Sequence, residues 1–250
     1  MTYTTIVSDW HGTLTSTSEE DSNKRIGYTL LGEALRDVKH GRIWRVAQLL
    51  KLLAAKKTTE RMLREFHQRK RRLKEVYEPF NSAIKGVTFD YIEGIADGFA
   101  RDTVENLDER VIVPIKNMHE KGKKTGILSV GYKRIIEKTL EQVGYSDVFD
   151  KIFANTLLGY DGKAVGFSLD VYEEKARYIM SRFLDIHTRE GDILYIGDSS
   201  DDMPVAQMLP KGNFIVPFLA PYEFKEEMAR KYGAFVPESQ KDLERYFKAR

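Results

Sequence analysis

A short apolar run near the N-terminus stops at an acidic residue, and this feature restricts the folds open to the chain. Residues 4–8 read Thr-Thr-Ile-Val-Ser, a β-branched segment typical of a buried strand. Asp9 follows directly, and a Gly12-Thr13 turn comes soon after it. Open α/β sheets bind their ligands at the carboxyl ends of their strands. The segment therefore predicts an α/β sheet whose first strand presents Asp9 to a ligand.

Residues 16–107 have the periodicity of helices. Apolar side chains recur three and four positions apart, and one such series is Leu30, Leu31, Ala34, Leu35 and Val38. A further helix is expected from Thr59 to Val76, because Pro79 interrupts the pattern. With a last helix over 89–106, we expect about four helices in this block.

Beyond Glu109, short apolar runs alternate with helical stretches. The expected strands are 124–130, 151–154, 192–197, 213–218 and 234–236. The expected helices are 132–143, 172–184, 203–209, 222–231 and 240–248. Alternation of this kind predicts right-handed crossovers and a doubly wound, mostly parallel sheet in three α/β/α layers. The segment 158–163 predicts a hairpin turn.

One strand thus precedes the helical block, and the other strands follow it. At 250 residues, the chain is long enough for a core domain with an insertion. We expect an α/β core made of residues 1–15 and 108–250, with residues 16–107 inserted as a helical cap.

Composition excludes several classes of protein. The chain has no cysteine, so disulfides, thiolate metal sites and a cysteine nucleophile are excluded. We find no apolar run near the 20 or so residues of a membrane helix and no signal-peptide layout, so we expect a cytoplasmic protein without a membrane partner. Between Arg36 and Lys74 stand 14 lysines and arginines against three acids. Solvated helix faces are the favoured explanation, and a nucleic-acid partner is the less favoured alternative.

A loop rich in carboxylates follows the expected strand 192–197. It reads Gly-Asp-Ser-Ser-Asp-Asp over residues 197–202. If this strand neighbours the first one, then Asp9, Asp198 and Asp202 converge, and their like charges require a cation. Carboxylate oxygens suit Mg²⁺ shared with a phosphate, although a turn aspartate is the simpler interpretation of Asp198 alone.

Two further residues suit phosphate binding. Ser129 ends an expected strand, and Gly131 precedes a helix, where free backbone N–H groups form an anion site. A helix cap is the alternative role for Ser129. Lys175 opens a helix, where the dipole disfavours a cation. It is either a solvated surface lysine or a counter-charge that holds a phosphate oxygen.

In chain order, these residues resemble the four motifs of the haloacid dehalogenase superfamily. Asp9 matches the nucleophile of motif I, Ser129 the hydroxyl of motif II, Lys175 the basic residue of motif III, and Asp198 with Asp202 the acidic motif IV. The segments Phe153-Ala154-Asn155-Thr156-Leu157 and Asp161-Gly162-Lys163 are similar to a hairpin of the phosphoserine phosphatase branch. In that branch a helical C1-type cap also follows motif I.

The resemblance implies a Mg²⁺-dependent phosphatase of small phosphorylated metabolites. Asp9 would form an aspartyl-phosphate that water hydrolyses. It implies that Asp9, the backbone carbonyl of His11 and Asp198 hold the ion, with Asp202 close by. The resemblance also implies that Ser129, Lys175 and the backbone N–H groups that include Gly131 bind the phosphate.

His11 departs from the phosphatase pattern, which has a second aspartate there that serves as general acid and base. An imidazole titrates near neutral pH and can take that role, or it marks a slow or inactive homologue. A non-catalytic protein that binds phosphate, Mg²⁺ and a partner through its basic cap is therefore one alternative. Another is a phosphonatase-type hydrolase, since Asp9-Trp10-x-Gly12-Thr13 resembles that branch as well.

Overall fold

The structure is a computed structural model. It describes residues 3–17, 19–42, 46–67, 73–168, 171, 175–184 and 189–250, of which 19–24, 63–67, 73 and 74 are described by their backbone alone.

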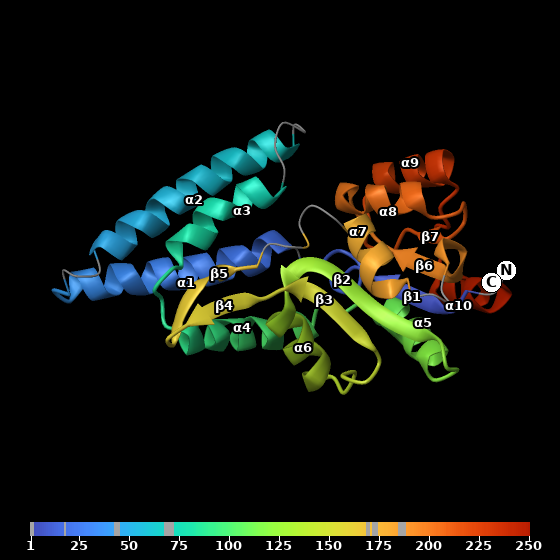
Figure 1. Cartoon of the computed structure of the whole chain (residues 1–250), viewed down its shortest axis with the longest axis horizontal. Coiled ribbons are helices and arrows are strands. Elements are labelled where there is room, and N and C mark those ends of the chain that lie inside the picture. Colours follow the sequence, from blue (N-terminus) through green and yellow to red (C-terminus); the bar gives the residue numbers. More distant parts are fainter. Residues whose placement is uncertain are drawn as a thin grey trace.

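Five parallel strands form one sheet in the order β3-β2-β1-β6-β7 (Figure 1). They are β1 (Thr5–Ser8), β2 (Lys124–Tyr132), β3 (Lys151–Asn155), β6 (Ile193–Ile196) and β7 (Phe214–Ile215). In the centre, Ser8 of β1 pairs with Ile127 on one side and Ile196 on the other. The expected α/β fold with a parallel sheet is confirmed, and the residues that follow β1, β2 and β6 meet at one edge.

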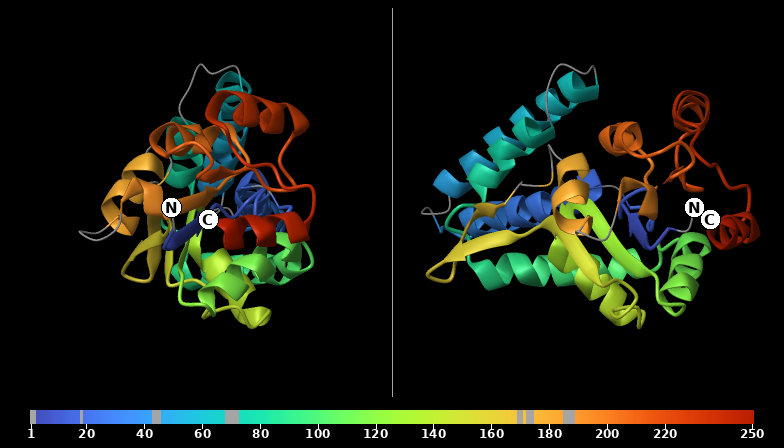
Figure 2. Two further views of the ribbon diagram at one scale, coloured as in Figure 1. Left: turned by 90° about the vertical axis from the view of Figure 1, so that its right-hand side faces the viewer. Right: turned by 45° about the vertical axis from the view of Figure 1, so that its right-hand side comes forward.

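Helices cover both faces of this sheet (Figures 1 and 2). One layer holds α5 (Glu109–His119), α6 (Lys133–Gln142) and α10 (Gln240–Ala249). The other holds α7 (Lys175–Tyr178), a π-helix (Ile179–Phe183), α8 (Met203–Met208) and α9 (Tyr222–Tyr232). Alternate strand residues face alternate layers: Ile6 belongs to the apolar cluster that includes α5 and α10, and Val7 to the one that includes α8.

A helical insertion extends to one side of the sheet (Figure 1). Its described residues form α1 (Glu19–Lys39), α2 (Val46–His67), α3 (Leu73–Ala83) and α4 (Phe89–Val104), in agreement with the expectation of about four helices. No helix among the described residues is long and apolar enough to span a lipid bilayer.

The prediction of one helix over residues 59–76 is wrong. Thr59 lies within α2 and Val76 within α3, with residues 68–72 outside the described part of the chain. Pro79 does not end a helix but lies inside α3. A proline removes one hydrogen bond from a helix, and burial of Val76 and Tyr77 against the core outweighs that loss here.

The two ends of the insertion lie side by side. The backbone N–H of Asp108 donates to the carbonyl of Leu14 at 2.8 Å, and that of Ser16 donates to the carbonyl of Asn106 at 2.9 Å. The chain therefore leaves the sheet and returns to it through one pair of neighbouring segments.

The expected hairpin is confirmed as β4 (Leu157–Tyr160) and β5 (Lys163–Phe167). Asp161 and Gly162 at its turn both have positive φ, 49° and 68°, as the tight turns of hairpins require. The hairpin also joins the insertion, since Ala164 N donates to the carbonyl of Val87 at 2.7 Å and its carbonyl accepts from Gly86 N at 2.8 Å.

Two boundaries differ from expectation near the end of the sheet. The strand expected over 213–218 is only the two-residue β7, and the one expected over 234–236 is a single bridge between Phe235 and Ile215. Pro217 and Pro237 end the two runs, and proline cannot donate a ladder hydrogen bond.

In the expected helix 172–184, residues 172–174 lie outside the described residues, and α7 and the π-helix occupy 175–183.

Candidate active site

Asp9 is the first residue beyond β1, at the edge of the sheet where the strands end. The residue is only 4% exposed, and its Oδ1 accepts from the backbone N–H of Trp10 at 2.6 Å. A carboxylate at such a site is oriented by the backbone and shielded from water.

Lys175, the first residue of α7, joins Asp9 to the acidic loop. Its Nζ lies 2.8 Å from Asp9 Oδ2 and 2.7 Å from Asp202 Oδ1. The lysine is itself only 4% exposed, so it is not a solvated surface residue. The structure thus brings together three predicted site residues that lie far apart in the sequence.

The site carries more negative than positive charge. Burial raises the pKa of Asp9 to about 6, although Lys175 opposes the shift. Burial also raises the pKa of Asp198 well above its usual range, and Asp9 and Asp202 add to the effect. Burial opposes the charge on Lys175, but Asp202 and Asp9 outweigh it and raise the pKa of the lysine well above its usual value. Lys175 is therefore charged, and it cannot neutralise three carboxylates alone.

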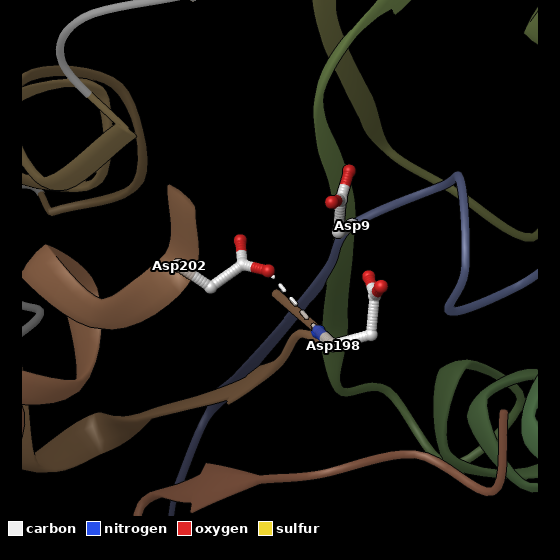
Figure 3. A group of neighbouring side chains, drawn as sticks. All are labelled: Asp9, Asp198 and Asp202. Atoms are coloured by element: carbon white, nitrogen blue, oxygen red, sulfur yellow. Dashed lines mark hydrogen bonds between the residues drawn. The ribbon is translucent and has the colours of Figure 1, made fainter. Parts of the chain in front are cut away.

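These carboxylates fit a cation. Asp9, Asp198 and Asp202 each offer an oxygen, and the three atoms lie within 4.8 Å of one another (Figure 3). With Lys175 counted, the ionised cluster has an excess of two negative charges, which a divalent ion balances. Hard oxygen ligands of this kind suit Mg²⁺ and similar ions. The acidic triad can therefore hold a metal ion.

The two oxygens of Asp202 have different partners. Oδ1 accepts from Lys175 and, at 2.7 Å, from the Tyr195 hydroxyl, whereas Oδ2 accepts from the backbone N–H groups of Asp198 at 3.1 Å and Ser199 at 3.3 Å. Asp202 is thus the anchor of the loop, and Asp198 points from the loop toward Asp9 (Figure 3).

The Gly12-Thr13 turn that follows β1 also holds the side chain of Asp198. Thr13 Oγ1 donates to Asp198 Oδ1 at 2.9 Å. Gly12 has a φ of 71°, and a β-carbon there would collide with the carboxylate of Asp198. The turn needs glycine for both reasons.

Ser129 lies in β2 and is fully buried. Its Oγ accepts from the backbone N–H of Gly131 at 3.1 Å, and α6 has Tyr132 as its N-cap, so Ser129 does not cap that helix. Asn155 Nδ2 of β3 donates to the carbonyl of Val130 at 2.7 Å and fixes this part of β2, where the pairing with β3 is irregular. Ser129 and Gly131 therefore form a small polar segment at the end of β2, the strand next to β1.

His11 faces this polar segment of β2. Its Nδ1 lies 3.1 Å from the Thr17 carbonyl oxygen and 3.3 Å from Thr17 Oγ1. A carbonyl oxygen can only accept, so Nδ1 carries a hydrogen. A methyl group at Gly131 would lie 2.7 Å from His11 Nε2 and 3.3 Å from Ser129 Oγ, so the Nε2 edge of the ring points at the polar segment of β2.

Sequence reasoning missed Tyr195. The feature that could have indicated it is a hydroxyl in the otherwise apolar run Ile193-Leu194-Tyr195-Ile196, three positions before Asp198. Burial raises the pKa of Tyr195 well above its usual range, and Asp202 adds to that, so the hydroxyl keeps its proton and donates.

The basic segment is described only in part. The side chains of Arg64, Arg69, Lys70, Arg71, Arg72 and Lys74 lie outside the described residues. Those of Lys51, Lys56, Lys57 and Arg61 are exposed on α2.

The chain is similar to proteins of known structure. The sequence profile of haloacid dehalogenase-like hydrolases matches residues 6–207. No curated protein matches the sequence as a relative. A substrate-bound phosphoserine phosphatase has a TM-score of 0.62 and 19% identity, with 100% of this chain and 99% of that chain covered. A protein of unknown function from Bordetella pertussis Tohama I has a TM-score of 0.65 and 13% identity, over 95% of this chain and 99% of that one. A cytosolic 5′-nucleotidase bound to cytidine has a TM-score of 0.57 and 18% identity, over 98% and 84%. At these identities the likeness shows the fold.

Proposed function

The chain belongs to the haloacid dehalogenase-like hydrolases, and from this premise we propose that it is a Mg²⁺-dependent phosphatase of a small phosphorylated metabolite. One observation carries the proposal: Asp9, a buried carboxylate at a strand end, is paired with Lys175 beside two more carboxylates. The solved structures named for phosphoserine phosphatase and 5′-nucleotidase share this fold and, by their names, act on phosphate monoesters.

Asp9, Asp198 and the backbone carbonyl of His11 would hold the ion, with Asp202 close by on its own hydrogen-bond donors. When bound, the ion supplies positive charge that offsets the carboxylates and the incoming phosphoryl group. Lys175, the hydroxyl of Ser129 and the N–H of Gly131 would bind the phosphoryl oxygens, where phosphoryl transfer gains most from fixed positive charge. The N–H of Gly131 would exchange its bond to Ser129 Oγ for one to the substrate.

In the first step, a carboxylate oxygen of Asp9 forms a bond to phosphorus while the bond from phosphorus to the leaving oxygen breaks. The protonated His11 gives its Nε2 proton to that oxygen, and the alcohol departs. In the second step, a water oxygen attacks phosphorus, the bond to Asp9 breaks, and Nε2 takes the proton. Inorganic phosphate leaves, and both side chains return to their starting states.

The contact between His11 and Thr17 supports this use of the histidine. Because Nδ1 donates to the Thr17 carbonyl, Nε2 is the nitrogen that exchanges a proton, and this edge points toward Ser129 and Gly131. The ring would then replace the aspartate that related phosphatases have at this position.

We further propose that residues 16–107 act as a cap that selects the substrate, over a core made of 1–15 and 108–250. Support comes from the paired ends of the insertion, Leu14 with Asp108 and Ser16 with Asn106. The cytoplasmic location and the absence of a membrane partner stay predictions from composition, and a nucleic-acid partner stays the less favoured alternative for the basic segment.

Phosphate release from an aryl phosphate with Mg²⁺ tests the proposal. We expect Asp9→Asn to lose turnover by a factor on the order of 10³ or more. Asp147→Asn, an exposed acid before β3, is the matched control and should keep full activity. If wild type is no faster than Asp9→Asn, the phosphatase assignment fails and the non-catalytic alternative gains. Turnover of a phosphonate but not of any phosphate ester would favour the phosphonatase-type alternative instead.

A screen of phosphorylated metabolites should then identify the substrate.

A further inference from the structure

We propose that Tyr195 is a positioning residue, which fixes the carboxylate of Asp202 and through it the ammonium of Lys175 against Asp9. The inference rests on the proposed function for its link to turnover, but its geometry stands without it.

Tyr195 reaches the site from inside the sheet. It lies in β6 with its side chain fully buried, and its ring packs on Phe214 of β7 at 5.6 Å between centroids. The hydroxyl points out of this apolar setting and donates to Asp202 Oδ1 at 2.7 Å. A buried hydroxyl costs free energy unless it is bonded, so the carboxylate accounts for its presence.

The same oxygen of Asp202 also accepts from Lys175. The two donors, at 2.7 Å each, hold Oδ1 between them, while Oδ2 is held by the loop backbone. Lys175 continues the series to Asp9 Oδ2 at 2.8 Å. Hydrogen bonds thus join four buried side chains in series, from Tyr195 of β6 through Asp202 and Lys175 to Asp9 at the end of β1.

Removal of the Tyr195 hydroxyl would change the electrostatic attraction that Asp202 and Asp9 exert on the ammonium of Lys175. With one donor gone, the charge of Asp202 Oδ1 is less well compensated and attracts the ammonium more strongly. Lys175 then shifts toward Asp202 and away from the place where it meets Asp9 and a phosphoryl oxygen. A phenylalanine ring would still fill the same space, so packing does not require the hydroxyl.

The test compares Tyr195→Phe with Tyr3→Phe. Tyr3 is also buried, and its hydroxyl donates to the Phe247 carbonyl at 3.1 Å, in the layer of α10. Both variants lose one buried hydrogen bond, so both should lower the melting temperature by a similar few degrees. Only Tyr195→Phe should lower kcat/KM, by about tenfold, because only it displaces Lys175.

A double-mutant cycle with Lys175→Met separates positioning from packing. If Tyr195 acts through Lys175, Tyr195→Phe should have little further effect on kcat/KM in the Lys175→Met background. Multiplication of the two single effects would overturn the inference.

Binding of inorganic phosphate in the presence of Mg²⁺, followed by calorimetry, needs no turnover. We expect the dissociation constant to rise severalfold in Tyr195→Phe and to stay unchanged in Tyr3→Phe. Equal affinities in wild type and Tyr195→Phe, or no phosphate binding by wild type, overturn the inference. A wild type that binds phosphate, is weakened by Tyr195→Phe and hydrolyses no ester would refute the phosphatase while the positioning role stands.

Discussion

Lys175 Nζ lies 2.8 Å from Asp9 Oδ2, and both side chains are almost wholly buried although 166 positions separate them in the sequence. A buried ion pair is weak evidence of stability, because both partners lose their hydration. Loss of one partner is more serious, since it leaves the other charge unpaired. The proposed role of Asp9 as the nucleophile therefore accounts for the pair better than the stability of the fold does.

Stability should depend on Mg²⁺ and pH together. Burial raises the pKa of Asp9 from 3.8 to about 6 in the metal-free protein, so its ionisation opposes folding. Its contribution to stability is therefore present below about pH 4 and is lost as the pH rises through about 6. Asp198 shifts in the same direction. We expect Mg²⁺ to raise the melting temperature more at pH 8 than at pH 5, as measured by calorimetry at constant ionic strength. An equal shift at both pH values, or an unchanged response in Asp198→Asn, would contradict a metal at this cluster.

The role of His11 is tested by leaving-group dependence. His11→Asp should retain or raise turnover, because it restores a carboxylic acid at the position. His11→Ala should slow the reaction mainly for esters with poor leaving groups, by a factor of about 10²–10⁴. Equal rates for wild type and His11→Ala across a series of aryl and alkyl phosphates would remove His11 from the mechanism.

Gly131 should tolerate no side chain. In Gly131→Ala, the methyl group would lie 2.7 Å from His11 Nε2, so the imidazole has to move and turnover should fall by at least about tenfold. Gly94→Ala in α4 is the control, since a β-carbon there meets nothing within 4 Å. It should keep its activity and gain roughly 0.5–1 kcal/mol of stability. Full activity in Gly131→Ala would show that His11 does not need its observed position.

Arg134 connects the sheet domain to the insertion. Its guanidinium binds Asp97 through Nε at 2.7 Å and a second nitrogen at 2.8 Å, and it lies 2.7 Å from Glu93. Arg134→Lys keeps the charge but loses the paired geometry. A double-mutant cycle of Arg134→Lys with Asp97→Asn should give a coupling of about 1 kcal/mol in urea unfolding, reduced by salt because the pair is partly exposed. A coupling that is zero at low salt would mean that this contact does not hold α4 on α6.

Those site residues whose position depends on the end of a strand could be predicted from the sequence. Asp9, Ser129 and Asp198 each follow or close an apolar run, and parallel strands bring such residues to one edge. The contact of Tyr195 with Asp202 depends on the direction of a side chain, and that of Thr17 with His11 depends on the path of the chain after β1. The periodicity of the sequence predicts neither of these features. Pro79 misled the helix assignment because burial outweighed local propensity in α3.

The hairpin β4–β5 follows β3 in the sequence, yet its backbone pairs with residues 86–89, which connect α3 to the first residue of α4. Asn81 of α3 also donates to the carbonyl of Phe167 at 3.1 Å. The helical insertion is thus contiguous in the gene but not in its hydrogen bonding. A chimaera that exchanged only residues 16–107 with a relative would leave one edge of this hairpin without its partner. The unit that can be transplanted between such proteins has two pieces, and the smaller of them lies within the sequence of the α/β core.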